Sequence, residues 1–293
     1  FELLAPRGRF VLFGMASGPE RITATFWLLD AHDSLARQSR REPDGTGLGW
    51  YDRDGKPERL RDPEPAWRDP SFSREAKEVE SRTFIAHIRL ASVGGLSVQN
   101  THPFLMKDRM LAHNGHIGGL PELEARLGPA RELVQGETDS ERFLALVTAE
   151  AERLGDTEKG LLAAARWVAE HLPLYALNII LTTDTDLWAL RYPDTHELWV
   201  LEREPHHGRH LDATSAAGTV RVRSQDLARV PCVIVASEPM TESPGWTLMK
   251  PGELLHVDAR LHTTRRVALP DPPKHQLRLQ DLEARAKESQ RGR

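Results

Sequence analysis

The chain has 293 residues, of which 39% are hydrophobic and 28% charged, a composition typical of folded globular proteins that excludes disorder throughout. Its 39 Lys and Arg residues stand against 43 Asp and Glu residues, and because both signs are interspersed we expect no nucleic acid partner. No stretch approaches the ~18 apolar residues of a membrane span, and no secretory signal pattern is present, so we expect a cytoplasmic protein without membrane contact.

The first third of the chain is predicted to form short strands around one helix. Residues 10–14 are an apolar strand candidate, and a helix with an apolar face is expected from residue 26 to before Pro43. The glycines of residues 42–49 indicate a tight turn entering a strand, since no Lys-Ser/Thr of a phosphate loop follows. Residues 53–80, rich in charge and proline, are predicted to be a surface excursion, whereas residues 83–90 alternate as a strand.

The remainder changes from helices back to strands. Residues 139–154 and 158–172 each carry an apolar stripe at helical spacing. Strands are predicted at residues 110–113, 174–182, 187–191, 198–201, 231–236 and 253–257. This order indicates a layered α/β or α+β fold. The only cysteine, Cys232, lies in one of these strands and is expected in the core, and we expect no disulfide, metal site or cofactor.

Four polar clusters fall at predicted strand ends or turns: residues 86–95, 100–104, 113–117 and 136–141. Together they offer what an α-amino acid ligand requires. The guanidinium of Arg89 can grip a carboxylate with two hydrogen bonds, and Asp139 can pair with an ammonium group. The Asn114-Gly115 turn can direct a side-chain amide and a backbone N–H at one oxygen, as an oxyanion hole does.

These motifs, in this order and spacing, resemble the class II glutamine amidotransferases, which are amino-terminal-nucleophile (Ntn) hydrolases. The motifs are His87-Ile88-Arg89, residues 100–104, His113-Asn114-Gly115 and residues 138–141, and residues 235–253 resemble the stand-alone bacterial branch that includes the ergothioneine-pathway γ-glutamyl hydrolase. The resemblance implies an α+β fold, the αββα four-layer Ntn-hydrolase sandwich, for a domain at residues 10–265. Residues 1–9 are then an N-terminal extension and residues 266–293 a C-terminal tail.

The resemblance also implies roles for individual residues. Arg89 and Ser92 would lie at the ligand's α-carboxylate, and Asp139 at its α-amino group. Asn114 and Gly115 would hold the oxyanion, and His113, which begins their motif, is assigned to substrate binding. The ligand implied is glutamine or a γ-glutamyl compound, and a synthase or other biosynthetic protein is a candidate partner.

One position departs from the family. The family's nucleophile is a terminal cysteine before a Leu-Phe/Leu-Gly sequence, and its own α-amine serves as base. Aligned on Leu12-Phe13-Gly14, that position is Phe10, whose ring cannot attack a carbonyl. The expectation is therefore a protein that binds glutamine or a γ-glutamyl compound as a pseudoenzyme or accessory subunit. Two alternatives stay open: an active amide hydrolase or amidotransferase using a different start or nucleophile, and a purely structural subunit of a biosynthetic complex.

Some of these residues also have simpler interpretations. His113 and His116 have a spacing that metal ligands can show, but strand-end histidines commonly serve as hydrogen-bonding scaffold, which we favour. Arg89 could be an ordinary ion-pair residue and Asp139 a helix cap. Their joint occurrence in one ordered set of motifs favours the ligand pocket.

Overall fold

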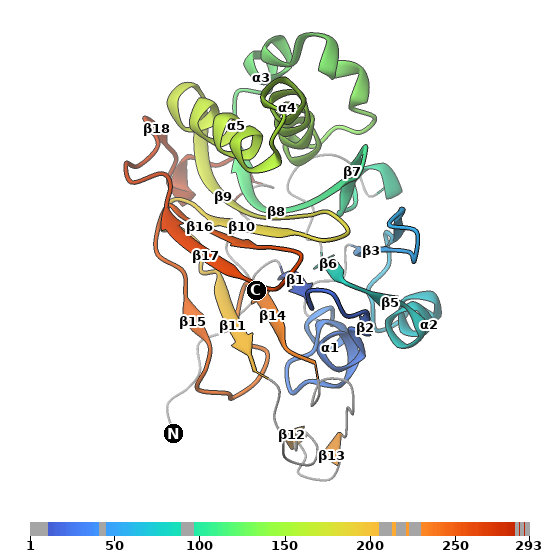
Figure 1. Cartoon of the computed structure of the whole chain (residues 1–293). Helices are drawn as coiled ribbons and strands as arrows, with labels where there is room; N and C mark the ends of the chain where they lie inside the picture. The colour runs from blue at the N-terminus through green and yellow to red at the C-terminus, as the bar shows by residue number, and fades with distance from the viewer. Residues whose placement is uncertain are drawn as a thin grey trace.

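Two antiparallel sheets stacked between helices form the computed structural model, which describes residues 11–40, 45–88, 97–204, 213–214, 221–222, 230–284, 287 and 290. Figure 1 shows α3, α4 and α5 over one sheet, and α1 and α2 beside the other. The layers are therefore helix, sheet, sheet, helix, which confirms the predicted αββα arrangement.

The first sheet has the strand order β15-β11-β14-β1-β6-β3-β4. Its strands are β1 (Val11–Ala16), β3 (Thr46–Tyr51), β4 (Pro57–Asp62), β6 (Thr83–Ile88), β11 (Trp199–Arg203), β14 (Cys232–Ala236) and β15 (Thr247–Leu248). The second sheet has the order β17-β16-β10-β9-β8-β7, and β18 joins it in parallel with β9. Its strands are β7 (Phe104–Met106), β8 (Arg109–Ile117), β9 (Pro173–Thr182), β10 (Leu187–Arg191), β16 (Glu253–Val257), β17 (Thr263–Val267) and β18 (His275–Gln276).

The helices lie outside the two sheets. They are a π-helical turn η1 (Phe26–Asp30), α1 (Leu35–Gln38), α2 (Pro70–Glu78), α3 (Leu120–Leu127), α4 (Asp139–Leu154), α5 (Thr157–His171), and the 3₁₀ turns η2 (Val98–Asn100), η3 (Gly128–Leu133) and η4 (Leu279–Asp281). The described residues also form two small two-stranded sheets: β2 (Ile22–Thr23) with β5 (Glu80–Ser81), and β12 (Ala213–Thr214) with β13 (Arg221–Val222). No helix among the described residues is long and apolar enough to cross a bilayer.

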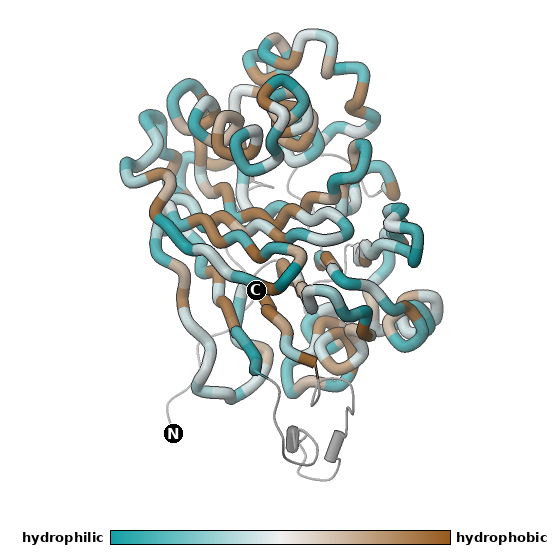
Figure 2. Tube along the Cα trace, viewed as in Figure 1, coloured by the Kyte–Doolittle hydropathy of each residue, from teal (hydrophilic) through white to brown (hydrophobic). Residues whose placement is uncertain are grey.

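Strand alternation divides the core into three layers. Phe13 and Met15 of β1 face η1, α1 and α2, whereas Leu12 and Ala16 face the second sheet. Because successive strand residues point to opposite faces, one strand supplies both layers, and its residues are buried on both sides. The third layer lies under α3, α4 and α5. Figure 2 shows the resulting hydrophobic runs along the central strands and alternating hydrophobic and hydrophilic residues along the helices.

Most predicted elements are confirmed. The helix predicted at residues 139–154 is α4, and the one at residues 158–172 is α5, shifted by one residue. The strands predicted at residues 187–191 and 253–257 are β10 and β16. Residues 89–90 of the strand predicted at 83–90 lie outside the described residues.

Residues 53–80 lie largely at the surface, as predicted, but they also contain β4 and α2, which the sequence did not predict. α2 starts where the carboxylate of Asp69 accepts a hydrogen bond from the N–H of Ser71, beside Pro70. The long helix expected from residue 26 is instead η1 and the single-turn α1, because the backbone at Ala31 is extended.

Gly160 lets α4 and α5 approach closely, and replacing it with alanine tests that contact. A Cβ atom at Gly160 would overlap the backbone of Ala151 on α4. Alanine normally stabilises a helix by ~1 kcal/mol relative to glycine. Here we expect Gly160→Ala to lower the free energy of unfolding by ~1–3 kcal/mol, the usual effect of overpacking, measured by urea denaturation. The exposed Glu170→Ala on the same helix serves as control, and a stabilised Gly160→Ala protein would contradict the close approach.

Candidate functional site

Asn114 lies near the end of β8 and faces the space between the two sheets. Met110 and Ala112, which precede it at alternate positions, both pack in the inter-sheet core. Strand periodicity therefore directs the Asn114 side chain into the same interior. Asn114 is only 1% exposed, so any ligand that reaches its amide must enter between the sheets.

Gly115 presents its backbone polar groups at the outer edge of β8. It pairs with Leu177 of β9, but the N–H of Leu177 donates to the carbonyl of Tyr192 on the other side, at 2.6 Å. Gly115 and Leu177 are therefore a pair without mutual hydrogen bonds, and the N–H and C=O of Gly115 both point away from β9. Among the described strands only β7 lies on that side, and it pairs no further along β8 than Leu111. Within the described part of the chain, no strand pairs with this N–H, which is directed at the open edge of β8.

A side chain cannot replace this glycine without moving β9. A Cβ atom on Gly115 would overlap the backbone carbonyl of Ala176 and approach the ring of His113. Asn114 and Gly115 therefore differ in what they provide. Asn114 supplies a side-chain amide, and Gly115 lets the backbone of β8 approach that of β9 closely. The oxyanion-hole role of this pair stays a prediction.

Asp139 joins the start of α4 to the end of β8. Its Oδ2 accepts a hydrogen bond from the N–H of Ile117 at 2.8 Å, and its Oδ1 accepts one from the N–H of Ser140 at 2.8 Å. The carboxylate is buried, and Nδ1 of His116 lies 3.8 Å from Oδ2. The helix cap itself is Thr138, whose Oγ1 accepts from the N–H of Glu141 at 3.2 Å. Asp139 is therefore the first helical residue, so its charge also suits the helix dipole.

His113 is held as a neutral scaffold residue on the opposite face of β8. Its Nε2 lies 3.1 Å from the carbonyl oxygen of Ala176, which can only accept, so Nε2 carries the hydrogen. Its Nδ1 then accepts from the hydroxyl of Ser140, at 2.9 Å. Burial lowers the pKa of His113, and the neighbouring Asp139 only partly opposes that shift. His113 thus links Ala176 of β9 to Ser140 of α4 through hydrogen bonds.

The loop before α4 is fixed by two side chains to which sequence reasoning gave no role. The carboxylate of Glu141 accepts from the N–H groups of Gly136 at 2.6 Å and Gln135 at 3.2 Å. The Oδ1 of Asn100 accepts from the N–H of Glu137 at 2.9 Å. Both residues lay within the quoted motifs. The role of Glu141 could have been predicted from the capping-box pattern of Thr138 followed by Glu141. Here Glu141 stabilises the loop before the helix.

The structure brings His113, Asn114, Gly115 and Asp139 together around the end of β8 and the start of α4. Arg89, Ser92 and Phe10 lie outside the described residues. The ligand-binding roles of Arg89, Ser92, His113, Asn114, Gly115 and Asp139 stay predictions.

Cys232 faces away from this region. Its side chain packs with the outer cluster under η1 and α2, whereas its neighbour Val233 faces the inter-sheet core. Burial raises the pKa of the Cys232 thiol to about 11, despite the nearby Arg203. A buried, protonated thiol on the outer face is a core residue, as expected. Among the described residues no group of three His, Cys, Asp or Glu side chains could hold a metal ion.

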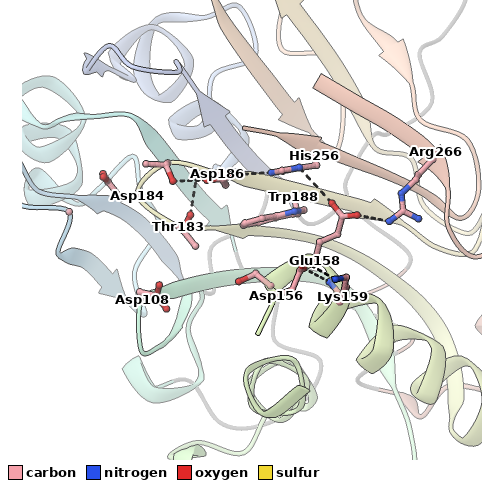
Figure 3. Close-up of a pocket in the computed structure, with 13 residues that line it drawn as sticks. Asp108, Asp156, Glu158, Lys159, Thr183, Asp184, Asp186, Trp188, His256 and Arg266 are labelled. Carbon is pink, nitrogen blue, oxygen red and sulfur yellow. Dashed lines mark hydrogen bonds and ion pairs between the residues drawn. The ribbon is translucent and has the colours of Figure 1, made fainter. Parts of the chain in front are cut away.

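A separate cleft of about 640 Å³ lies at the opposite end of β9, where the chain turns into β10. Figure 3 shows His256 there between two carboxylates, 2.7 Å from Asp186 and 3.6 Å from Glu158. Glu158 also pairs with Arg266 at 2.5 Å, and Lys159 pairs with Asp156 at 3.6 Å. Burial opposes ionisation of Asp186, but the hydrogen bonds from His256 and Thr185 lower its pKa overall. These pairs tie the second sheet to the start of α5, which indicates a structural network.

Comparison with known proteins agrees with this geometry. The family described as "Glutamine amidotransferases class-II" matches residues 11–277. The γ-glutamyl-hercynylcysteine sulfoxide hydrolase of Mycobacterium tuberculosis is 31% identical over 207 residues, which is 69% of this chain and 70% of that protein. The putative glutamine amidotransferase YafJ of Escherichia coli is 28% identical, covering 72% of this chain and 83% of YafJ.

Solved structures show the same fold. A glutamine aminotransferase class-II domain protein from Silicibacter pomeroyi superposes with a TM-score of 0.58 at 23% identity, covering 87% of this chain and 98% of that one. The structure titled as the allosteric regulatory enzyme of purine biosynthesis gives a TM-score of 0.63 at 20% identity, covering 89% of this chain and 50% of that one. These superpositions confirm the predicted Ntn-type sandwich.

Replacing His113 should change how stability depends on pH. The pKa of His113 in the folded protein lies below its unfolded value of 6.5. Between these two pKa values, His113 is protonated in the unfolded chain and neutral in the folded one. The free energy of unfolding therefore falls as the pH drops below 6.5 and through the lowered folded pKa. We expect His113→Gln to show a smaller loss than the unsubstituted protein, measured by urea denaturation at pH 7.5 and pH 5. If both proteins lost the same free energy of unfolding between pH 7.5 and pH 5, His113 would not titrate in this way.

Proposed function

Because the chain belongs to the class II glutamine amidotransferases, we propose that it binds glutamine or a γ-glutamyl compound at the end of β8 without thiol chemistry at position 10. The observation that carries the proposal is the meeting of Asn114, the outward N–H of Gly115 and the carboxylate of Asp139 at one end of β8. An amide carbonyl and an α-amino group are the two ligand features that these groups complement.

The proposed contacts follow from charge and hydrogen-bonding type. The ligand's side-chain carbonyl oxygen accepts from the N–H of Gly115 and from the amide of Asn114. The ligand's ammonium group lies at Asp139, where a positive charge compensates the buried carboxylate. Arg89 supplies a guanidinium for the α-carboxylate. Phe10, at the family's nucleophile position, offers neither a thiol nor a hydroxyl, so the bound amide is not attacked from there.

A second candidate function is amide hydrolysis. It is favoured by the names of the relatives in Mycobacterium tuberculosis and Mycolicibacterium smegmatis, which are γ-glutamyl-hercynylcysteine sulfoxide hydrolases at 31% and 27% identity. A hydrolase releases glutamate, whereas a binding protein leaves the ligand intact. Glutamate release from glutamine and γ-glutamyl dipeptides, measured with the natural protein, separates the two.

A third candidate is an accessory subunit that binds a synthase differently depending on whether glutamine is bound. Such a subunit requires a stable partner, and co-purification of one biosynthetic protein whose affinity changes with glutamine would support it. A structural subunit would instead keep its partner with the same affinity whether or not glutamine is present.

Asp139→Asn tests the proposed ammonium contact. Asparagine keeps an oxygen for the N–H of Ile117 but loses both the charge and the second acceptor, which serves the N–H of Ser140, so we expect binding of L-glutamine to weaken at least tenfold and the melting temperature to fall. Isothermal titration calorimetry measures the affinity. The matched control is Asp156→Asn, which neutralises the cap residue of α5 in the distant cleft. Equal affinity in Asp139→Asn and the unsubstituted protein would remove Asp139 from the site.

A gain-of-function variant tests whether only the nucleophile is missing. A chain that begins with cysteine at position 10, after removal of its initiator methionine, has both a thiol and a free α-amine. We expect it to release glutamate from glutamine, whereas the same chain beginning with Phe10 releases none. Adding Asn114→Ala to the active variant should lower kcat by ~10²–10³, the typical effect of removing an oxyanion-hole donor. Binding without turnover in the cysteine variant would show that further groups of the machinery are absent.

A further inference from the structure

The described part of the C-terminal tail packs back onto the candidate site. β18 pairs in parallel with the start of β9, and the N–H of Leu277 donates to the carbonyl of Leu174 at 2.8 Å. Further along, Leu282 is 7% exposed and packs against Tyr175 and Ala176 of β9. The tail therefore runs along the strand that neighbours Asn114 and Gly115.

Gln290 brings a carboxamide to the edge of β8. Its Nε2 donates to the carbonyl oxygen of Gly115 at 3.1 Å, and its Oε1 lies 2.6 Å from Nε2 of His196. An amide oxygen only accepts, so Nε2 of His196 is the donor in that pair. Gln290 is 5% exposed, which means that this contact is enclosed by protein.

The carboxamide of Gln290 lies at the same strand edge as the proposed oxyanion donor. The N–H and C=O of Gly115 point to one side of β8, because the N–H of Leu177 bonds to the carbonyl of Tyr192, just after β10, instead. A group that bonds to the C=O therefore stands beside the N–H. Gln290 has the same side-chain amide as glutamine, the ligand proposed for this edge.

We propose that the docked tail, through Gln290, occupies the amide end of the candidate pocket and competes with the ligand for it. This inference rests on the proposed function. Ligand binding requires the tail to move, so the apparent dissociation constant is the intrinsic constant divided by the fraction of molecules with an undocked tail. The tail thereby sets the ligand concentration at which the pocket fills.

The contacts that hold the tail are few enough for reversible release. Among the described residues, the cluster around Leu282 contains two other buried residues, Tyr175 and Ala176, with Leu277 and Leu279 partly buried against it, and the side chains of η4 are largely exposed. Segments with few buried apolar contacts open at much lower free energy than the core. Among the described residues beyond Leu282, the two hydrogen bonds of Gln290 are side-chain contacts that hold the end of the tail to the rest of the fold.

Two variants release the tail through separate contacts. Gln290→Ala removes both side-chain hydrogen bonds, and Leu282→Ala removes the apolar anchor. The matched control is Glu283→Ala, which alters an exposed side chain of the same segment. Titration calorimetry with L-glutamine measures affinity, and hydrogen–deuterium exchange of residues 275–290 measures docking with and without glutamine.

We expect both tail variants to bind L-glutamine about fivefold to tenfold more tightly than the unsubstituted protein and the control. Glutamine should also increase exchange in the tail of the unsubstituted protein. Equal or weaker binding by the variants, with exchange showing a released tail, overturns the competition while leaving the proposed function intact. Absence of binding by every variant overturns both, and binding by the tail variants alone supports both.

Discussion

The carboxylate of Asp139 is the interaction on which the candidate site depends. One oxygen accepts from the N–H of Ile117 at the end of β8, and the other from Ser140 in the first turn of α4. A single buried group thus sets the position of a helix relative to a strand edge. His113, Asn114 and Gly115 lie within the last residues of that strand, so their geometry follows from this link. A buried carboxylate with only neutral donors also creates a strong preference for a cation nearby.

The sequence predicted this region well because its physical signals are local. Asp139 and Glu141 follow Thr138 at the start of a strongly periodic helix, and α4 begins where they indicate. The strand predicted at residues 110–113 belongs to β8, but β8 continues to Ile117, so the turn predicted at Asn114 and Gly115 is instead part of the strand. The family resemblance joined these local signals into one fold, which the class II match over residues 11–277 confirms.

The misses arise where local pattern and tertiary context disagree. β4 has the sequence Pro-Glu-Arg-Leu-Arg-Asp, which lacks alternation, yet it pairs with β3 because the edge of the first sheet needs only backbone hydrogen bonds on one side. β17 is likewise an exposed edge strand. The contact between Gln290 and Gly115 joins residues separated by 175 positions, and no local pattern encodes such a pairing. Long-range polar contacts of this kind are specified only by the packed structure.

Because Cys232 is buried, the folded protein is expected to react very slowly with thiol reagents. With a pKa of about 11, only ~1 in 10,000 of these thiols is ionised at pH 7, and the side chain is fully covered. Alkylation of the native chain therefore reports on global unfolding and not on surface chemistry. For the same reason, a cysteine introduced at any exposed position would be the sole reactive thiol, so a single dye or spin label could be attached there without replacing Cys232.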